Sequence, residues 1–257
     1  MNYFRNVVFI AAIAGLVAGL AMTVMQAFTT DPLILQAEVY ENAEAAAPAA
    51  AEAAHDHDQA AMSTAEGEQA AAPAHEHDDE GWSPADGFER NAYNVLANLV
   101  GAIGFGLVLV AASELAGGMG DWRQGVFWGL AGFTVFTLAP SLGLNPELPA
   151  MPAADLLSRQ IWWIGTAAAT AVALYLLFLR RSPALAALGI AILVVPHIIG
   201  APQPADHSTP IPENLHHSFI VASTLTNLVF WVVLGAAVAT VRARFAEPAG
   251  DARRSFA

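Results

Sequence analysis

Six long apolar runs, separated by polar segments, give the chain its main pattern. Their approximate bounds are 7–28, 95–116, 126–144, 161–179, 184–200 and 218–241. Each run has about 17–24 residues, and about 20 are enough for a helix to cross the hydrocarbon layer of a bilayer. Backbone N–H and C=O groups find no water in that layer, so a continuous apolar run must satisfy its hydrogen bonds within a helix. The pattern therefore predicts an all-α, polytopic membrane bundle of about six transmembrane helices.

The fifth run leaves the number of spans open between five and six, because it is short and contains Pro196 and His197. The distribution of arginine favours six. With a cytoplasmic N-terminus, six spans place eight of the ten arginines inside and only Arg90 and Arg159 outside, which is the excess that the positive-inside rule expects. Five spans would leave either Arg180–Arg181 or the C-terminal arginines outside. We therefore expect a multi-pass protein of a bacterial inner membrane with both termini in the cytoplasm.

The first run has an alternative interpretation as a cleaved signal peptide, since Arg5 precedes it. Its length of about 22 apolar residues exceeds the usual signal core, and Phe28–Thr29–Thr30–Asp31 lacks a small-x-small cleavage site. We expect a retained helix, in which Gly15 and Gly19 allow close helix packing.

The segment between the first two runs has a different composition from the rest of the chain. Residues 31–89 hold 15 of the 23 acidic residues, and residues 41–80 contain almost no aliphatic residue other than Ala. Such a segment cannot bury enough apolar surface to fold, so we expect a disordered periplasmic loop, with short interfacial helices at 33–40 and 88–93. The predicted divisions are a first transmembrane helix (1–30), the acidic loop (31–93), a five-helix membrane bundle (94–245) and a cytoplasmic tail (246–257).

Composition also excludes several classes of protein. The chain has no Cys, which excludes disulfides and thiolate metal sites. Its net charge of −13 excludes the basic footprint of a nucleic-acid-binding protein. Nucleophile elbows, P-loops, dinucleotide fingerprints and the His-Glu-x-x-His motif do not occur. We therefore expect neither an enzyme nor an organic cofactor.

Histidine supplies the main candidate chemistry, because all eight histidines fall on the predicted outer side. Four of them alternate with carboxylates in the acidic loop, at His55, His57, His75 and His77. Imidazole nitrogen and carboxylate oxygen suit first-row divalent ions such as cobalt, nickel and zinc, and tracts of this kind are typical of metal binding. The alternative is an ordinary solvated acidic linker.

A second group of candidate metal ligands surrounds the fifth and sixth runs. It consists of His197, Asp206, His207, Glu213, His216 and His217. Since Ser223 and Asn227 follow His216 at i+7 and i+11, the three share one helical stripe, which favours a water-filled path or a protein contact over lipid. We expect His216 to converge with His197. The alternative is interfacial histidine with ordinary helix–helix hydrogen bonding.

Met22, Met25 and Glu114 bear on an ion path, and Asp155 and Arg159 bear on the start of the fourth helix. Met22 and Met25 lie on one face of the first helix, where thioethers can line a path for an ion but more commonly fill a core. Glu114 lies near the inner end of the second helix, where it either lines an exit or reaches the interface. Asp155 is predicted to cap the fourth helix, with Arg159 four residues later placed to pair with it. We expect the polar path to run between the first, fifth and sixth helices.

Four features in this order carry a family resemblance: Phe4–Arg5 before a glycine-rich helix, the acidic His-bearing loop, the segment Pro146–Asp155 leading to paired tryptophans, and Pro196–His197 with its His-containing loop. With them the chain resembles the CbtA family of probable cobalt transporter subunits. The resemblance implies Co²⁺ as the transported ion, a link to cobalamin biosynthesis and a small single-span, His-rich partner of the CbtB kind. It also implies five spans, where the arginines favour six.

The leading interpretation is therefore a subunit of a divalent metal (cobalt) uptake transporter in the lipid bilayer. The alternative is a membrane scaffold or metal-sensing subunit that assembles with a separate permease.

Overall fold

The computed structural model describes residues 2–44, 84–85, 87–180 and 182–245. Every regular element in these ranges is a helix, so the predicted all-α membrane bundle is confirmed. The predictions made for residues 45–83 of the acidic loop, including His55, His57, His75 and His77, and for the tail 246–257 lie outside the described residues.

The long helices correspond to the six apolar runs. Single helices are α1 (Asn2–Phe28), α3 (Phe88–Leu115), α7 (Pro183–Ile199) and α8 (Glu213–Phe245). The third run is one helical stretch composed of α4 (Trp122–Phe133), the π-helix η1 (Thr134–Leu138) and α5 (Ala139–Ser141). The fourth run is α6 (Leu156–Leu174), continued by the π-helix η2 (Tyr175–Leu179).

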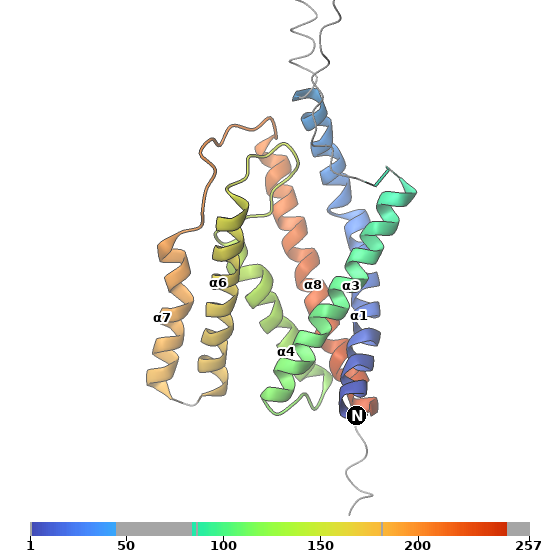
Figure 1. The fold of residues 1–257 in the computed structure, drawn as a ribbon, viewed down its shortest axis with the longest axis vertical. Coiled ribbons are helices and arrows are strands. Elements are labelled where there is room, and N and C mark those ends of the chain that lie inside the picture. The colour runs from blue at the N-terminus through green and yellow to red at the C-terminus, as the bar shows by residue number, and fades with distance from the viewer. Residues whose placement is uncertain (1, 45–83, 86, 181, 246–257) are drawn as a thin grey trace, which may run out of the picture.

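Successive helices run in alternating directions (Figure 1), as helices that cross one layer must. Four stretches have the length and apolar composition to span a bilayer: Phe4–Phe28, Phe88–Leu115, Leu156–Leu179 and Glu213–Phe245. The shorter α7 is also apolar. The start of α1 and the end of α8 lie at the same end of the bundle, which we call the N-terminal end. The opposite end is called the loop end.

Glycines set the two closest helix contacts. A Cβ on Gly15 of α1 would lie 2.7 Å from the backbone of Ile103 in α3, which confirms the predicted close packing of the first helix. The α4–α8 contact, which the sequence analysis did not single out, is closer still. A Cβ on Gly129 would lie 2.2 Å from the carbonyl oxygen of Trp231, and one on Gly235 would lie 2.1 Å from that of Gly125. Both helix pairs therefore pack backbone against backbone.

Aromatic rings fill the space between α3, η1 and α8. Phe136 stacks on Trp231 with ring centroids 5.6 Å apart, and Phe105 contacts both rings. This cluster belongs to the main apolar core, which also takes in buried residues of α1.

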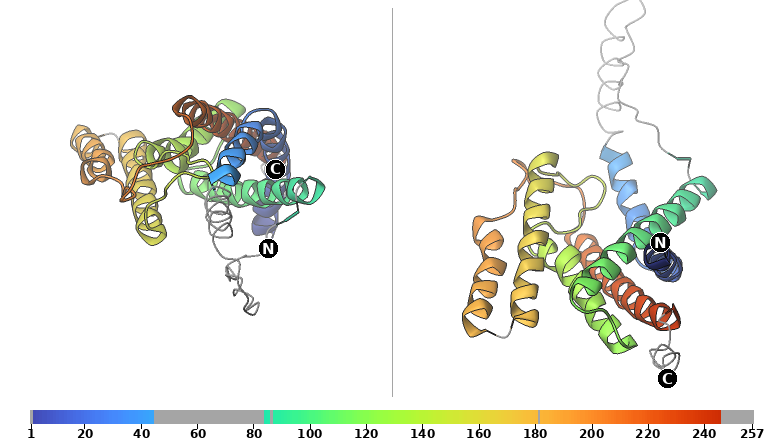
Figure 2. Two further views of the ribbon diagram at one scale, coloured as in Figure 1. Left: turned by 90° about the horizontal axis from the view of Figure 1, so that it is seen from above. Right: turned by 60° about the horizontal axis from the view of Figure 1, so that its bottom comes forward.

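The pair α6 and α7 stands to one side of this core. In Figures 1 and 2, α6 lies between α7 and the remaining helices, and the packing partners of α7 are α6 and η2. The expected path between the first, fifth and sixth helices is therefore wrong, since α7 does not pack on α1 or α8.

Loops at the loop end fold into a small second core. The helical segment 31–44 contributes Ala37, the loop 142–155 contributes Leu148, and the loop 200–212 contributes Ile211, which pack with Leu215 and Phe219 of α8. The predicted helix at 33–40 is thus part of a longer one, whereas 88–93 forms the first turns of α3 rather than a separate element. This core holds the two loops against the start of α8.

Candidate functional site

A cavity of about 170 Å³, which we call the outer cavity, lies where the two loops meet α8. Its lining includes Glu147, Met151, Gln203, His207 and His216. Carboxylate, imidazole, amide and thioether groups thus face one space, a donor set suited to a first-row transition metal ion rather than to Mg²⁺ or Ca²⁺.

A larger cavity of about 660 Å³, the inner cavity, adjoins it between η1–α5, α6 and α8. Its polar lining includes Thr137, Arg159, Gln160 and Asn227, while Leu144, Asn145 and Glu147 line both cavities. Asn227 lies eleven residues beyond His216 on α8, or about 16 Å along the helix at 1.5 Å per residue. The two cavities therefore lead from the loop end toward the middle of α8. The π-helix η1, a feature that often marks functional sites, forms part of the wall.

His216 and His217 have different surroundings although they are adjacent on α8. The Nε2 atom of His216 is 3.2 Å from the carbonyl oxygen of Pro146, and its half-buried ring lines the outer cavity. His217 is exposed, as is Glu213 in the first turn. A separation of about 100° between neighbouring helical residues accounts for this difference.

The loop 200–212 contributes His207 to the outer cavity, while the adjacent Asp206 is not among the lining residues. The Asp206 carboxylate accepts hydrogen bonds from the backbone N–H and the hydroxyl of Ser208, at 2.9 and 2.7 Å. Both hydrogen bonds lower the pKa of Asp206 from its ordinary value, and the bond from the backbone N–H of Ser208 has the larger effect. Asp206 therefore remains charged at mildly acidic pH and adds negative potential near the cavity.

Glu147, which the sequence analysis did not single out, lines both cavities. Its carboxylate forms an ion pair with Arg159, at 2.9 Å between Oε2 and Nη2. The expected Asp155–Arg159 pair is not formed. Asp155 instead caps α6 as predicted, accepting from the backbone N–H of Ser158 at 2.9 Å, and its hydroxyl at 2.7 Å. With Asp155 so occupied, Arg159 is paired with the loop carboxylate. The signal in the sequence was an acidic residue fixed between Pro146 and Pro149.

His197 lies in the last turn of α7, away from both cavities. Its ring packs edge-on against Trp162 of α6, with centroids 6.0 Å apart, and Trp162 donates a hydrogen bond to the carbonyl oxygen of Pro196. His197 does not share a cavity with His216, so the structure does not bring together the pair that we expected. Within the ranges that the structure describes, no three or more His, Asp or Glu side chains form a ready metal site.

The polar groups of α1 face α3 and α8 rather than the cavities. Met22 packs against the main core, and Gln26 accepts a hydrogen bond of 2.6 Å from Asn98. Thr29, whose hydroxyl donates to the carbonyl oxygen of Met25, also lies 3.1 Å from the hydroxyl of Thr226 on α8. Neither Met22 nor Met25 is among the cavity-lining residues.

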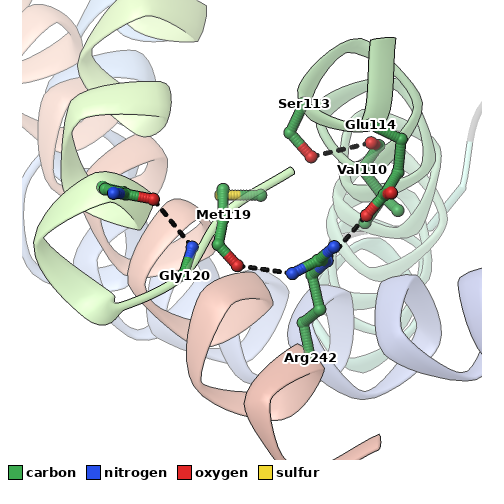
Figure 3. A network of polar contacts seen from close by, with 7 residues as sticks. Val110, Ser113, Glu114, Met119, Gly120 and Arg242 are labelled. Atoms are coloured by element: carbon green, nitrogen blue, oxygen red, sulfur yellow. Dashed lines mark hydrogen bonds and ion pairs between the residues drawn. The ribbon is translucent and has the colours of Figure 1, made fainter. Parts of the chain in front are cut away.

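The N-terminal end of the bundle is tied together by Arg242 of α8 (Figure 3). Its Nε donates to Glu114 of α3 at 2.6 Å, and its Nη1 donates to the carbonyl oxygen of Met119 at 2.5 Å. Glu114 is therefore engaged in an ion pair. Both cavities described above lie at or extend from the opposite end.

A family model described as probable cobalt transporter subunit (CbtA) matches residues 4–243, a range that contains both cavities and nearly all the described helices. The chain belongs to the CbtA family. Comparisons with curated proteins and with solved structures gave no match. Membership of CbtA makes the protein a cobalt transporter subunit, which implies a membrane setting and a partner subunit.

Proposed function

We propose that this CbtA-family subunit admits Co²⁺ into the cell through the outer cavity and then the inner cavity. The observation that carries the proposal is the junction of the two cavities: Glu147 lines both, and His207 and His216 line the outer one. A hydrated cation reaching this junction exchanges water for imidazole and carboxylate ligands. Moderate affinity suits a transporter, because the ion must leave again.

In this proposal all six helices cross a bacterial inner membrane, with both termini in the cytoplasm. The helix ends at the N-terminal end carry Arg5, Arg123, Arg180, Arg242 and Arg244, and this clustering supports a cytoplasmic position for that end. The cavities then open toward the periplasm. The acidic loop, with His55, His57, His75 and His77, would raise the local concentration of cations at that side.

The proposal includes a partner, since the family consists of transporter subunits. The resemblance suggests a small, single-span, His-rich protein of the CbtB kind and a supply of cobalt for cobalamin biosynthesis. His197 and Asp206 remain candidate ligands at the outer surface, where they would act before the ion reaches the cavity, whereas the exposed Glu213 and His217 line neither cavity and serve as control positions.

The test is uptake of radioactive cobalt by cells that lack other cobalt importers and express the chain with its partner. We expect the double variant Glu147→Gln/His216→Ala to lose most of this uptake. The matched control is Glu213→Gln/His217→Ala, which changes the same residue types at exposed positions of α8. Equal uptake by both variants would contradict the proposed path. Uptake that never depends on this chain would instead favour the scaffold or sensing alternative.

A further inference from the structure

Arg159 and Glu147 form an ion pair at the junction of the two cavities. Their side chains are 29% and 26% exposed, so the pair is partly shielded from water. Glu147 lines both cavities, whereas Arg159 lines only the inner one. A cation that moves from the outer to the inner cavity must therefore pass a carboxylate that already has a positive partner.

We infer that Arg159 is a built-in counter-ion that competes with the incoming cation for the Glu147 carboxylate and so sets which cations bind. The inference rests on the proposed function and assigns a selectivity role to a residue of the same site. A single carboxylate stabilises one adjacent positive charge far better than two, because the two cations repel each other. Cation binding at Glu147 thus requires that the guanidinium withdraw.

The surrounding backbone allows the side chain to move while the framework stays in place. Pro146 and Pro149 fix φ on either side of Glu147, and the buried Leu148 anchors the loop in the second core. On α6, the Asp155 cap fixes the first turn, and the backbone N–H of Arg159 donates to the carbonyl oxygen of Asp155 at 3.0 Å. The inner cavity, about 660 Å³ in volume, gives the guanidinium room to withdraw.

The histidines decide which kinds of cation overcome this competition. Co²⁺ gains imidazole ligands from His207 and His216 when it replaces the guanidinium, and first-row transition metal ions favour such ligands. Mg²⁺ and Ca²⁺ prefer oxygen and gain little from imidazole, so they have less free energy available to displace Arg159. The Arg159 counter-ion therefore lowers the affinity of the site for every cation. Only cations that also bind histidine gain enough free energy to displace it.

The experiment measures Co²⁺ and Mg²⁺ binding to the purified full-length chain in detergent by titration calorimetry. Arg159→Gln should bind both ions about three- to tenfold more tightly than the wild type, in line with the modest strength of a partly exposed ion pair. The gain should vanish in the Glu147→Gln background, which would show that Arg159 acts through that carboxylate. Loss of affinity in Arg159→Gln would indicate a purely structural role and would overturn the inference.

The matched control is Arg90→Gln. Arg90 pairs with Glu38 at the same end of the bundle, and the two side chains are 29% and 28% exposed, nearly as in the Glu147 pair. We expect Arg90→Gln to leave the Co²⁺ affinity unchanged. An equal gain in both variants would mean that only the general electrostatic field matters, and it would overturn the specific role of Arg159.

A measurement on the wild type keeps the test valid if Arg159→Gln fails to fold. Co²⁺ should increase the rate at which phenylglyoxal modifies Arg159, read by mass spectrometry, because the guanidinium leaves its carboxylate. The rate at Arg90 should stay constant. An unchanged rate at Arg159 under saturating Co²⁺ overturns the inference alone, whereas a wild type that binds no Co²⁺ overturns the proposed function itself.

Discussion

His216 and His217 occupy consecutive positions, yet only His216 lines a cavity. Replacing His216 with Ala removes an imidazole from the outer cavity and should weaken Co²⁺ binding by about tenfold or more, the range seen when groups around a metal are lost. His217→Ala is the control, since its side chain is exposed and should change the affinity little. Calorimetric titration of both variants checks the difference. Two silent substitutions with normal folding would remove His216 from the path.

How far the site could be predicted depends on whether a residue's partner is local. The helical stripe of His216, Ser223 and Asn227 predicted a protein contact or a path on that face, and His216 and Asn227 do line the two cavities. Asp155 was correctly predicted to cap α6. The i, i+4 rule then assigned Arg159 to Asp155, whereas the fold pairs it with Glu147. That pair depends on how the loop 142–155 folds back onto α6, which no local spacing encodes.

At the scale of the helix, the cap of α6 links stability to pH. Hydrogen bonds from Ser158, its hydroxyl first, hold the pKa of Asp155 below its ordinary value. A lowered folded-state pKa means that the charged cap stabilises the fold above the unfolded-state pKa, about 3.9, and that this contribution is lost as pH falls through the folded-state value. The Asp155→Asn variant has no charge to lose, so its Tm should fall less steeply than that of the wild type between about pH 5 and pH 2. Parallel Tm curves would contradict this account.

The contact between α4 and α8 depends on glycine. A Cβ on Gly129 meets the backbone of Trp231, which cannot rotate away, so the helices must separate. We expect Gly129→Ala to destabilise the protein by about 1–3 kcal/mol, the usual cost of overpacking, or more. Gly101→Ala is the control, because a Cβ there has no neighbour within 4 Å. Unfolding followed by circular dichroism in detergent compares the two. Similar stability of both variants would show that α4 and α8 can adjust.

The positions of the helices along the chain were easier to predict than which helices pack against one another. Hydropathy located all six helices, because burial in lipid requires a continuous apolar run whatever lies beside it. It did not show that α7 packs on α6 alone, since lipid-facing and protein-facing surfaces have similar composition. The π-helices η1 and η2 were not predicted, because hydropathy does not distinguish a π-helix from an α-helix. Pro140, two residues after η1, is a local signal that was not used.

For the whole molecule, Arg242 ties α8 to α3 and to the loop before α4 at the N-terminal end. Replacing it with Gln removes the ion pair with Glu114 and weakens the tie to Met119. We expect the space lined by Asn6, Val110 and Phe245 to open.

Since the chain has no cysteine, Asn6→Cys provides a single reactive probe. Its reaction with a water-soluble maleimide should accelerate several-fold in the Arg242→Gln background and remain unchanged with Arg244→Gln, an exposed neighbour. Equal rates would contradict this role of Arg242.

The direction of transport depends on which end of the bundle faces the cytoplasm. The alternating helices place the start of α1 and the end of α8 together, so a crossing by all six puts both termini in one compartment. Eight of the ten arginines then share that compartment, and only Arg90 and Arg159 lie opposite, beside the carboxylates that pair with them.

Reporter fusions check this topology. A reporter fused after Ala257 should report a cytoplasmic position, and one inserted within 66–72 should report a periplasmic position. A periplasmic C-terminus would mean that α7 does not cross. A periplasmic N-terminal end of the bundle would turn both cavities inward, and the same residues would then describe an exit rather than an uptake path.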